Sequence, residues 1–324
     1  MPPADRPGVF QLMQCQSSMT QHLDITRESW IMVALLGLTW GSTFLVIELA
    51  LRGIGPAWLA ASRIGFAALL MIAVQAIRRA PLFLEPTSPK PWGTLIAVAL
   101  LSSAVPFSLL SWGQQYVTSG FAGVSMAAVA LMVLPLAHVL VPGEQISWRK
   151  AAGFGVGFIG VVVLIGGQAF DTTGDAREPL GRAAVLGVAA CYAVSSVLMR
   201  RLPPVDPVNL SGVLLIIGAA AVLPAALIAE GPPPAIGRET LFWIALLGLV
   251  PTAGANVLRV LVIRRAGPTF MSITNYIVPL VSVLMGWLVL AEPLPGSLLA
   301  ALALILAGVG LSQYGALRRL FGRG

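Results

Sequence analysis

Long apolar runs alternate with short polar segments along the chain, and the length of these runs predicts the fold class. A helix that crosses the hydrocarbon core of a bilayer needs about 20 mainly apolar residues. The chain holds ten such runs, which predicts an all-α integral membrane protein with ten transmembrane helices. The expected helices are Ile31–Leu51, Ala57–Ile77, Trp92–Trp112, Gly120–Val141, Ala151–Gly167, Arg182–Met199, Val208–Ala229, Leu241–Ile263, Thr269–Leu290 and Ser297–Ala316.

The composition supports a membrane environment. Of the 324 residues, 57% are hydrophobic and 10% are charged. A soluble domain carries about 25% charged residues, so the polar side chains here are too few to cover a globule. The net charge of +7 then reflects which side of the membrane each loop occupies, and it does not indicate nucleic-acid binding.

The positions of lysine and arginine predict the topology. With the amino terminus in the cytoplasm and the spans alternating, fourteen of these residues fall on the cytoplasmic side and four on the opposite side. The cytoplasmic set is Arg6, Arg27, Arg78, Arg79, Lys90, Arg149, Lys150, Arg200, Arg201, Arg264, Arg265, Arg318, Arg319 and Arg323, and the opposite set is Arg52, Arg177, Arg182 and Arg238. Because cytoplasmic loops carry the excess of positive charge, both termini are expected in the cytoplasm.

The two halves of the chain share a pattern at an offset of 148 positions. Matching pairs are Leu140 with Leu288, Val141 with Val289, Glu144 with Glu292, Ala152 with Ala300, Gly160 with Gly308 and Val161 with Val309. A fixed offset of this size indicates an internal repeat. Each repeat would hold an odd number of helices, so the second copy would enter the membrane from the opposite side. Inverted repeats of this kind are typical of secondary transporters, which bind their solute between the halves.

Two stretches carry a family resemblance. Gly267–Glu292 is an apolar run with small residues near its start, Pro279 in its middle and an acid at its end, and a helix with a Gly-Val pair follows it. Gly37–Phe44 reads Gly-Leu-Thr-Trp-Gly-Ser-Thr-Phe. In this order, the stretches resemble the two repeats of the drug/metabolite transporter (DMT) superfamily, in its EamA branch. The resemblance extends over residues 30–316.

The resemblance implies a permease of the bacterial inner membrane that works by alternating access, commonly as an exporter. Small metabolites such as amino acids, or amphipathic drugs, would be its solutes. The implied division of the chain is a disordered cytoplasmic tail (1–29), a first EamA repeat (30–167), an outer linker (168–180), a second EamA repeat (181–316) and a basic cytoplasmic tail (317–324).

Polar residues within the spans are the candidate lining of a central cavity. Trp40 and Thr43 share one face of the first helix by their spacing. Tyr192 and Ser195 lie in the sixth helix, although serines also hydrogen-bond within their own helix. The ninth helix carries a polar stripe that should not face lipid, and it either packs against another helix or contacts solute. The stripe residues that we take as candidates are Ser272, Asn275 and Tyr276.

Apart from Arg182 at the start of the sixth span, three charged residues lie inside the predicted spans. Such a charge costs about 2.5–3.5 kcal/mol on an insertion scale, so it pairs or faces water. Glu48 and Arg63 form a structural pair near an outer gate, or Glu48 serves as a proton or carboxylate-binding group, or it reaches the interface. Arg259 either extends to the cytoplasmic interface or faces the cavity, which Asn256 three residues earlier favours.

Other motifs point away from catalysis. Gly155–Gly160 satisfies the dinucleotide pattern G-x-G-x-x-G, but it lies in an apolar span without a preceding strand, so Gly153, Gly157 and Gly160 are expected to pack against a helix. Glu144 and Glu292 are interpreted as helix-end anchors.

We expect no cofactor, no metal site and no nucleic-acid partner. The partners would be a small-molecule solute and membrane lipids, and the pattern specifies no oligomeric state. An intramembrane lipid-modifying enzyme and a non-transporting sensor or scaffold are the competing readings.

The topology makes a direct prediction. Reporter fusions at the two ends of the chain should both report the cytoplasmic side, because the charge asymmetry requires an even number of spans. A reporter fused in the segment between the predicted repeats, such as after Asp175, should report the opposite side. Fusions that place the two chain ends on opposite sides of the bilayer would contradict the inverted repeat.

Overall fold

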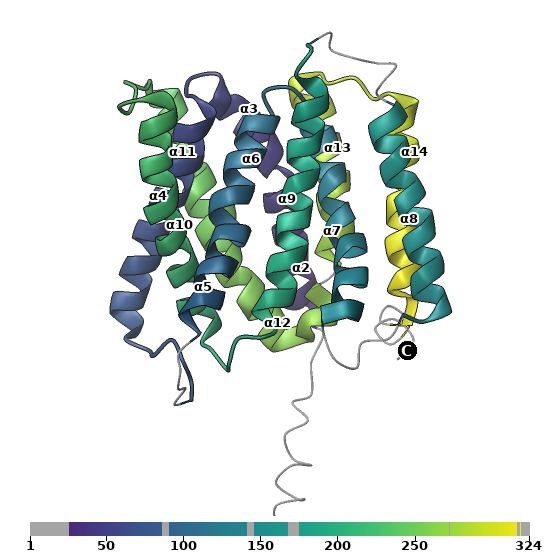
Figure 1. Ribbon diagram of the computed structural model, residues 1–324, viewed down its shortest axis with the longest axis horizontal. Coiled ribbons are helices and arrows are strands. Elements are labelled where there is room, and N and C mark those ends of the chain that lie inside the picture. The colour runs from purple at the N-terminus through teal and green to yellow at the C-terminus, as the bar shows by residue number, and fades with distance from the viewer. Residues whose placement is uncertain are drawn as a thin grey trace, which may run out of the picture.

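The computed structural model describes residues 26–85, 91–140, 146–167, 175–271, 273–315 and 318. These residues form helices that stand side by side in one bundle (Figure 1), with one isolated antiparallel bridge between Phe83 and Val205. The helices are α2 (Arg27–Gly41), α3 (Thr43–Leu51), α4 (Pro56–Arg78), α5 (Trp92–Ala99), α6 (Val105–Gly113), α7 (Ser119–Leu140), α8 (Trp148–Gly167), α9 (Glu178–Met199), α10 (Pro207–Glu230), α11 (Arg238–Leu247), α12 (Ala255–Met271), α13 (Thr274–Leu290) and α14 (Gly296–Ser312), with π-helical segments η1 (Leu100–Ala104) and η2 (Gly248–Gly254).

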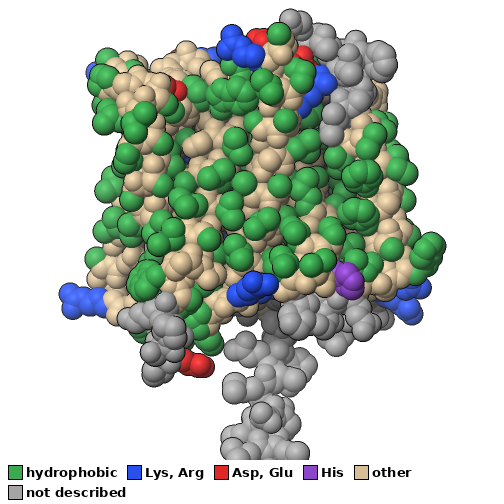
Figure 2. Space-filling model, in the orientation of Figure 1, with side chains coloured by type: hydrophobic (Ala, Val, Ile, Leu, Met, Phe, Trp, Pro, Cys, Tyr) green, Lys and Arg blue, Asp and Glu red, His purple; other side chains and the backbone are tan. Residues whose placement is uncertain are grey.

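The bundle is that of a multi-pass membrane protein. Seven helical segments in the described part of the chain are long and apolar enough to cross a bilayer, and α13 and α14 are shorter apolar helices. Figure 2 shows hydrophobic side chains across the middle of the visible face, whereas charged side chains gather at its two ends. This distribution suits a hydrocarbon layer flanked by two aqueous boundaries.

Two π-helical segments interrupt the bundle at equivalent places. The segment η1 joins α5 to α6, and η2 joins α11 to α12. Their first residues, Leu100 and Gly248, are separated by the same 148 positions that relate the two halves of the sequence. A π-helix inserts an extra residue into a turn and is often found at functional sites. The shared interruption supports a duplicated architecture that includes this irregularity.

Some boundaries differ from those that the sequence predicts. The sequence predicts a break between Ile263 and Thr269, yet α12 continues to Met271 and α13 begins at Thr274. Proline is tolerated inside membrane helices because neighbouring groups satisfy the freed carbonyl. Two helices also begin earlier than the sequence predicts. α2 begins at Arg27, within the expected tail (1–29), and α9 begins at Glu178, within the expected linker (168–180). At the first of these starts, the Thr26 side chain accepts from the backbone N–H of Ser29.

Glycines allow α8 and α14 to pack closely. A Cβ atom on Gly308 would meet the backbone of Gly153 and Gly157, and a Cβ on Gly160 would lie 2.9 Å from the backbone nitrogen of Ile305. Small residues let membrane helices approach one another in this way. The prediction that these glycines pack against a helix is confirmed.

Two carboxylates tie the end of one helix to the start of another. Glu292 follows α13, and its oxygens accept from the backbone N–H groups of Ser119 at 2.8 Å and Gly120 at 3.0 Å, at the start of α7. Glu230 ends α10 and accepts in the same way from Ala57 at 2.8 Å. The first N–H groups of a helix lack intrahelical partners and attract negative charge. The anchor role predicted for Glu292 is confirmed, and Glu144 lies outside the described residues.

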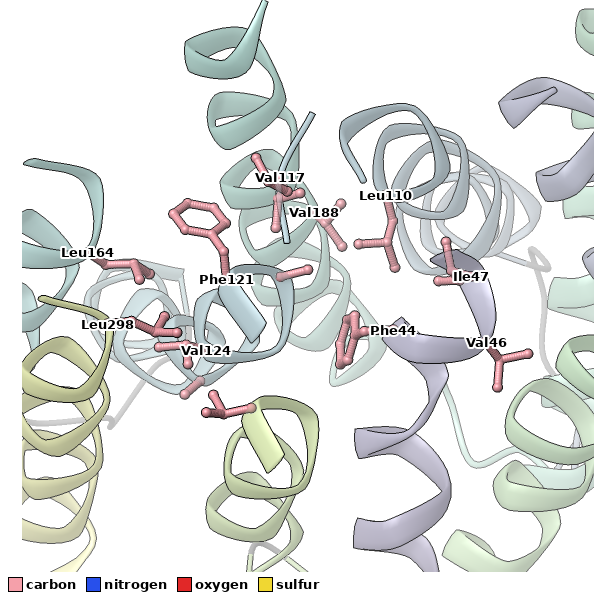
Figure 3. Close-up of a cluster of buried hydrophobic side chains, with 14 of the residues drawn as sticks. Phe44, Val46, Ile47, Leu110, Val117, Phe121, Val124, Leu164, Val188 and Leu298 are labelled. Carbon is pink, nitrogen blue, oxygen red and sulfur yellow. The ribbon is translucent and has the colours of Figure 1, made fainter. Parts of the chain in front are cut away.

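The largest buried core joins both halves of the chain. Figure 3 shows side chains of α3, α6, α7 and α8 converging with those of α9 and α14. Phe121 of α7 and Val188 of α9 are fully buried in this cluster. The halves therefore share one apolar interior, and a polar group within it needs a specific partner.

Replacing Glu292 with alanine should destabilise the fold. The change leaves two backbone N–H groups at the start of α7 without their acceptor, and the loss of such a cap costs about 1–2 kcal/mol. Thermal unfolding of the purified protein in detergent measures this effect. Glu239→Ala is the matched control, because Glu239 is exposed and, among the described residues, accepts a single long bond, 3.4 Å from Trp243 Nε1. Equal melting temperatures for the two variants would contradict the capping role.

Candidate functional site

The segment Pro251–Thr252 of η2 is a meeting point for polar side chains. Proline has no N–H, and the wider π-turn leaves carbonyl oxygens available to other donors. The indole Nε1 of Trp40 donates to the carbonyl oxygen of Pro251 at 3.1 Å. The Asn256 side-chain amide donates to the carbonyl oxygen of Thr252. The Thr252 hydroxyl donates to the carbonyl oxygen of Leu247 at 2.7 Å.

Arg63 of α4 reaches the same segment. Its side chain is buried, with the whole residue 5% exposed. The Nε group donates to the Thr252 hydroxyl oxygen at 2.8 Å, and the guanidinium carbon lies 4.0 Å from the centroid of the Phe107 ring. Nη1 is buried and has no hydrogen-bond partner among the described residues. Tyr192 of α9 lies close enough to interact electrostatically with Arg63.

Gly248 brings η2 into contact with α4. A Cβ atom at this position would lie 2.5 Å from Cβ of Phe66 and 2.8 Å from the carbonyl oxygen of Arg63. Neither is the far end of a flexible side chain, so the two backbones touch only because residue 248 has no side chain. This contact fixes the distance over which Arg63 reaches Thr252.

The predicted ion pair between Glu48 and Arg63 is wrong. Arg63 bonds to Thr252 instead, because η2 packs directly against α4 at this depth. Glu48 is half-buried in α3, and its charged neighbours are Glu292 and Arg52. Within the described ranges, Glu48 forms no hydrogen bond or ion pair that would hold it as a structural partner.

Two of the predicted lining hydroxyls bond within their own helices. Thr43 donates to the carbonyl oxygen of Thr39 at 3.0 Å, and Ser195 donates to that of Tyr192, also at 3.0 Å. Both residues are buried. This is the common behaviour of hydroxyls in membrane helices. Their hydroxyl hydrogens are used locally, so they contribute little to a shared polar site.

The stripe of α13 divides between two environments. Asn275 is exposed, whereas Tyr276 is half-buried with a hydroxyl that finds no partner among the described residues. A Cβ atom on Gly310 of α14 would lie 4.0 Å from Cε1 of Tyr276, so this ring contacts the glycine side of α14. Ser272 lies outside the described residues. The hydrogen bonds of the Arg63 cluster include neither Asn275 nor Tyr276.

Arg259 continues the polar face of η2 and α12. Thr252, Asn256 and Arg259 follow one another at four and three residues, the spacing of one helix face. The Arg259 side chain is exposed. Arg259 forms no hydrogen bond or ion pair with another residue in the described part of the chain.

Sequence reasoning missed the residues that organise this cluster. Trp40, Arg63, Tyr192 and Asn256 were candidates, but Thr252, Phe107 and Gly248 were not. The available indication was Pro251 in the middle of an apolar span, next to a threonine. A proline there breaks the hydrogen-bond ladder and marks where outside donors can bind. In the described part of the chain, no group of three or more His, Cys, Asp or Glu side chains is arranged to hold a metal ion.

The fold and the cluster define a helical multi-pass membrane protein with a polar, cationic site in its interior. The model of the EamA-like transporter family matches residues 28–166 and again residues 179–313. The chain belongs to this family.

Named relatives cover almost the whole chain. The uncharacterized transporter YoaV of Bacillus subtilis is 22% identical over 89% of this chain and 98% of its own length. A probable terminal-alkyne amino-acid exporter of Streptantibioticus cattleyicolor is 28% identical over 93% of this chain and 97% of its own length. A crystal structure that is 21% identical superimposes with a TM-score of 0.64 over 91% of this chain and 99% of that chain, which shows a shared fold.

Gly248→Ala should destabilise the protein by about 1–3 kcal/mol, because overpacking forces the two backbones apart. The matched control is Gly65→Ala on α4, where a Cβ atom meets nothing within 4 Å. Thermal unfolding in detergent compares them. A Gly248→Ala protein as stable as the control would show that α4 and η2 do not touch as described.

Proposed function

We propose that the protein is a secondary transporter that moves a small solute by alternating access. The observation that carries this proposal is the Arg63–Thr252–Trp40 cluster, which links α2 and α4 of the first half to η2 of the second half. A solute site between two repeats is the arrangement of secondary transporters. The names of the relatives, which are transporters and an exporter, support it.

The proposed architecture has ten spans in two inverted five-helix repeats, residues 30–167 and 181–316. The two family matches and the π-segments at a common offset support it. The charge asymmetry supports a bacterial inner membrane location with both termini in the cytoplasm. Interrupted helices at equivalent positions of two halves commonly mark the solute site.

The proposed solute is an amino acid or a comparable amphipathic molecule that is exported. The residues proposed to contact it are Trp40, Tyr192, Asn256 and Arg259, together with Arg63. These side chains combine aromatic surface, hydrogen-bond donors and positive charge, which suits a molecule with an apolar part and an anionic group. The relative from Streptantibioticus, named as a terminal-alkyne amino-acid exporter, supports this class. The names of the relatives are also consistent with a protein that is not an enzyme.

Solute flux in proteoliposomes tests the proposal. The panel contains propargylglycine (a terminal-alkyne amino acid), common amino acids and amphipathic drugs, each with and without a pH gradient. We expect at least one amino acid to cross faster than in protein-free liposomes, with saturation at high concentration. Folded, reconstituted protein that moves none of the panel would contradict transport of this solute class.

Glu48 is the proposed coupling group, because it is a half-buried carboxylate without a bonded partner in the described structure. Glu48→Gln should abolish accumulation driven by a pH gradient and leave solute exchange intact. Glu239→Gln, at an exposed position, should change neither. Accumulation that survives Glu48→Gln would assign coupling to another group.

A further inference from the structure

Arg63 holds a charge that its protein neighbours satisfy only in part. A guanidinium has five N–H donors and no acceptor. Thr252 accepts from Nε, and the Phe107 ring covers one face of the group. Nη1 is buried without a partner in the described ranges. Arg63 forms no ion pair with another described residue.

The described side chains that contact Arg63 and η2 carry no negative charge that could balance it. Trp40 and Asn256 donate their hydrogens to backbone carbonyls of η2, and Thr252 supplies a neutral oxygen. Arg259, further along the same helix face, adds a second positive charge. A cation in the membrane interior is costly unless an anion or water meets it. A negative group that arrives from outside the fold would balance this charge.

Tyr192 supplies the second donor next to this charge. Its residue is half-buried and packs against both of the larger apolar cores, so the ring stands where the two cores meet. Phe107, whose ring covers the Arg63 guanidinium, belongs to one of these cores, so Tyr192 and Arg63 lie in the same part of the interior. Phe107 and Thr252 act on the guanidinium itself, since the ring and the hydroxyl hold its plane and leave Nη1 free.

We infer that Arg63 binds the carboxylate of the transported solute, with the Tyr192 hydroxyl as a second donor, so that the protein selects solutes that carry a carboxylate. This inference rests on the proposed function, and it adds the recognition element of the site. A carboxylate accepts charge-assisted hydrogen bonds from arginine, which are shorter and stronger than neutral ones. Thr252 and Phe107 are positioning residues, because they orient Arg63 without donating to the solute.

The test compares three forms of one probe as stabilisers of the purified protein against heat. Propargylglycine has both charged groups, its N-acetyl derivative keeps the carboxylate alone, and its carboxamide lacks the carboxylate. A ligand that binds the folded state raises the melting temperature in proportion to its occupancy. We expect the first two to stabilise the wild-type protein at concentrations at least about tenfold lower than the carboxamide.

Variants assign the effect to Arg63. Arg63→Gln should remove the preference for the acid over the carboxamide, Arg63→Lys should retain part of it, and Tyr192→Phe should reduce it several-fold while keeping the ring. Thr252→Val should weaken acid binding without removing the preference. Arg238→Gln, at an exposed position, is the control and should keep the full preference. If Arg63→Gln does not fold, the inference is still tested by the acid preference of the wild-type protein and by the reduction of that preference in Tyr192→Phe.

Three outcomes would overturn the inference. One is equal stabilisation by the acid and the carboxamide, or no stabilisation by the acid. Another is an acid preference that survives Arg63→Gln. The third is stabilisation by chloride or sulfate as strong as that by the acid, which would make Arg63 a general anion site. Acid-dependent stabilisation without any flux would instead contradict the proposed transport and leave the carboxylate assignment standing.

Discussion

The structure depends on a backbone irregularity, the π-turn of η2, which exposes main-chain acceptors inside the bundle. A regular helix uses every interior N–H and C=O group, so it can bind nothing through its backbone. At Pro251 and Thr252 this ladder is opened, and Trp40 and Asn256 take up the two carbonyl oxygens. Lipid cannot satisfy such groups, so the irregular turn has to lie in the protein interior. The position of η2 in turn determines which side chains of α2 and α4 meet it.

The charged residues of this protein fall into two groups, which differ in how many of their polar atoms are hydrogen-bonded. Glu230 and Glu292 lie at helix ends, where their oxygens are used by backbone N–H groups of the next helix. Such bonded charges fix the geometry of the bundle and are not free to bind solute. Arg63 is instead bonded at one nitrogen and lies about two turns inside α4, where solvation is poor. A charge left partly unsatisfied in the interior lowers stability, and it is retained where a ligand completes it.

The sequence alone predicts the helices, the duplication and the family, because these depend on the lengths of apolar runs and on a repeated pattern. It also predicts the glycine face of α8 and the anchoring role of Glu292. It assigns the wrong partner to Arg63, because Glu48 and Arg63 lie at similar depths in adjacent helices. Depth follows from residue counting, whereas the direction of a side chain depends on the rotation of each helix, which packing sets. The absence of a side chain at Gly248 allows η2 to touch α4, which brings Thr252 next to Arg63. The sequence shows a glycine in an apolar span, but it does not show which helix packs against that glycine. The same limit applies to Thr43 and Ser195, whose hydroxyls turn back onto their own helices.

The bond between Arg63 and Thr252 also constrains how the halves can move. It joins α4 of the first half to η2 of the second, close to the Gly248 contact that holds the two backbones together. A rocking motion of the halves must either carry this pair as one unit or break it. Carrying it would leave the site intact in both orientations, because α4 and η2 would move together against the remaining helices. Breaking it would expose a bare guanidinium in the interior, which is costly without an anion. If the halves move as proposed, the energetics favour a moving body that includes α4 and η2, with the proposed solute site at its edge next to Tyr192 of α9.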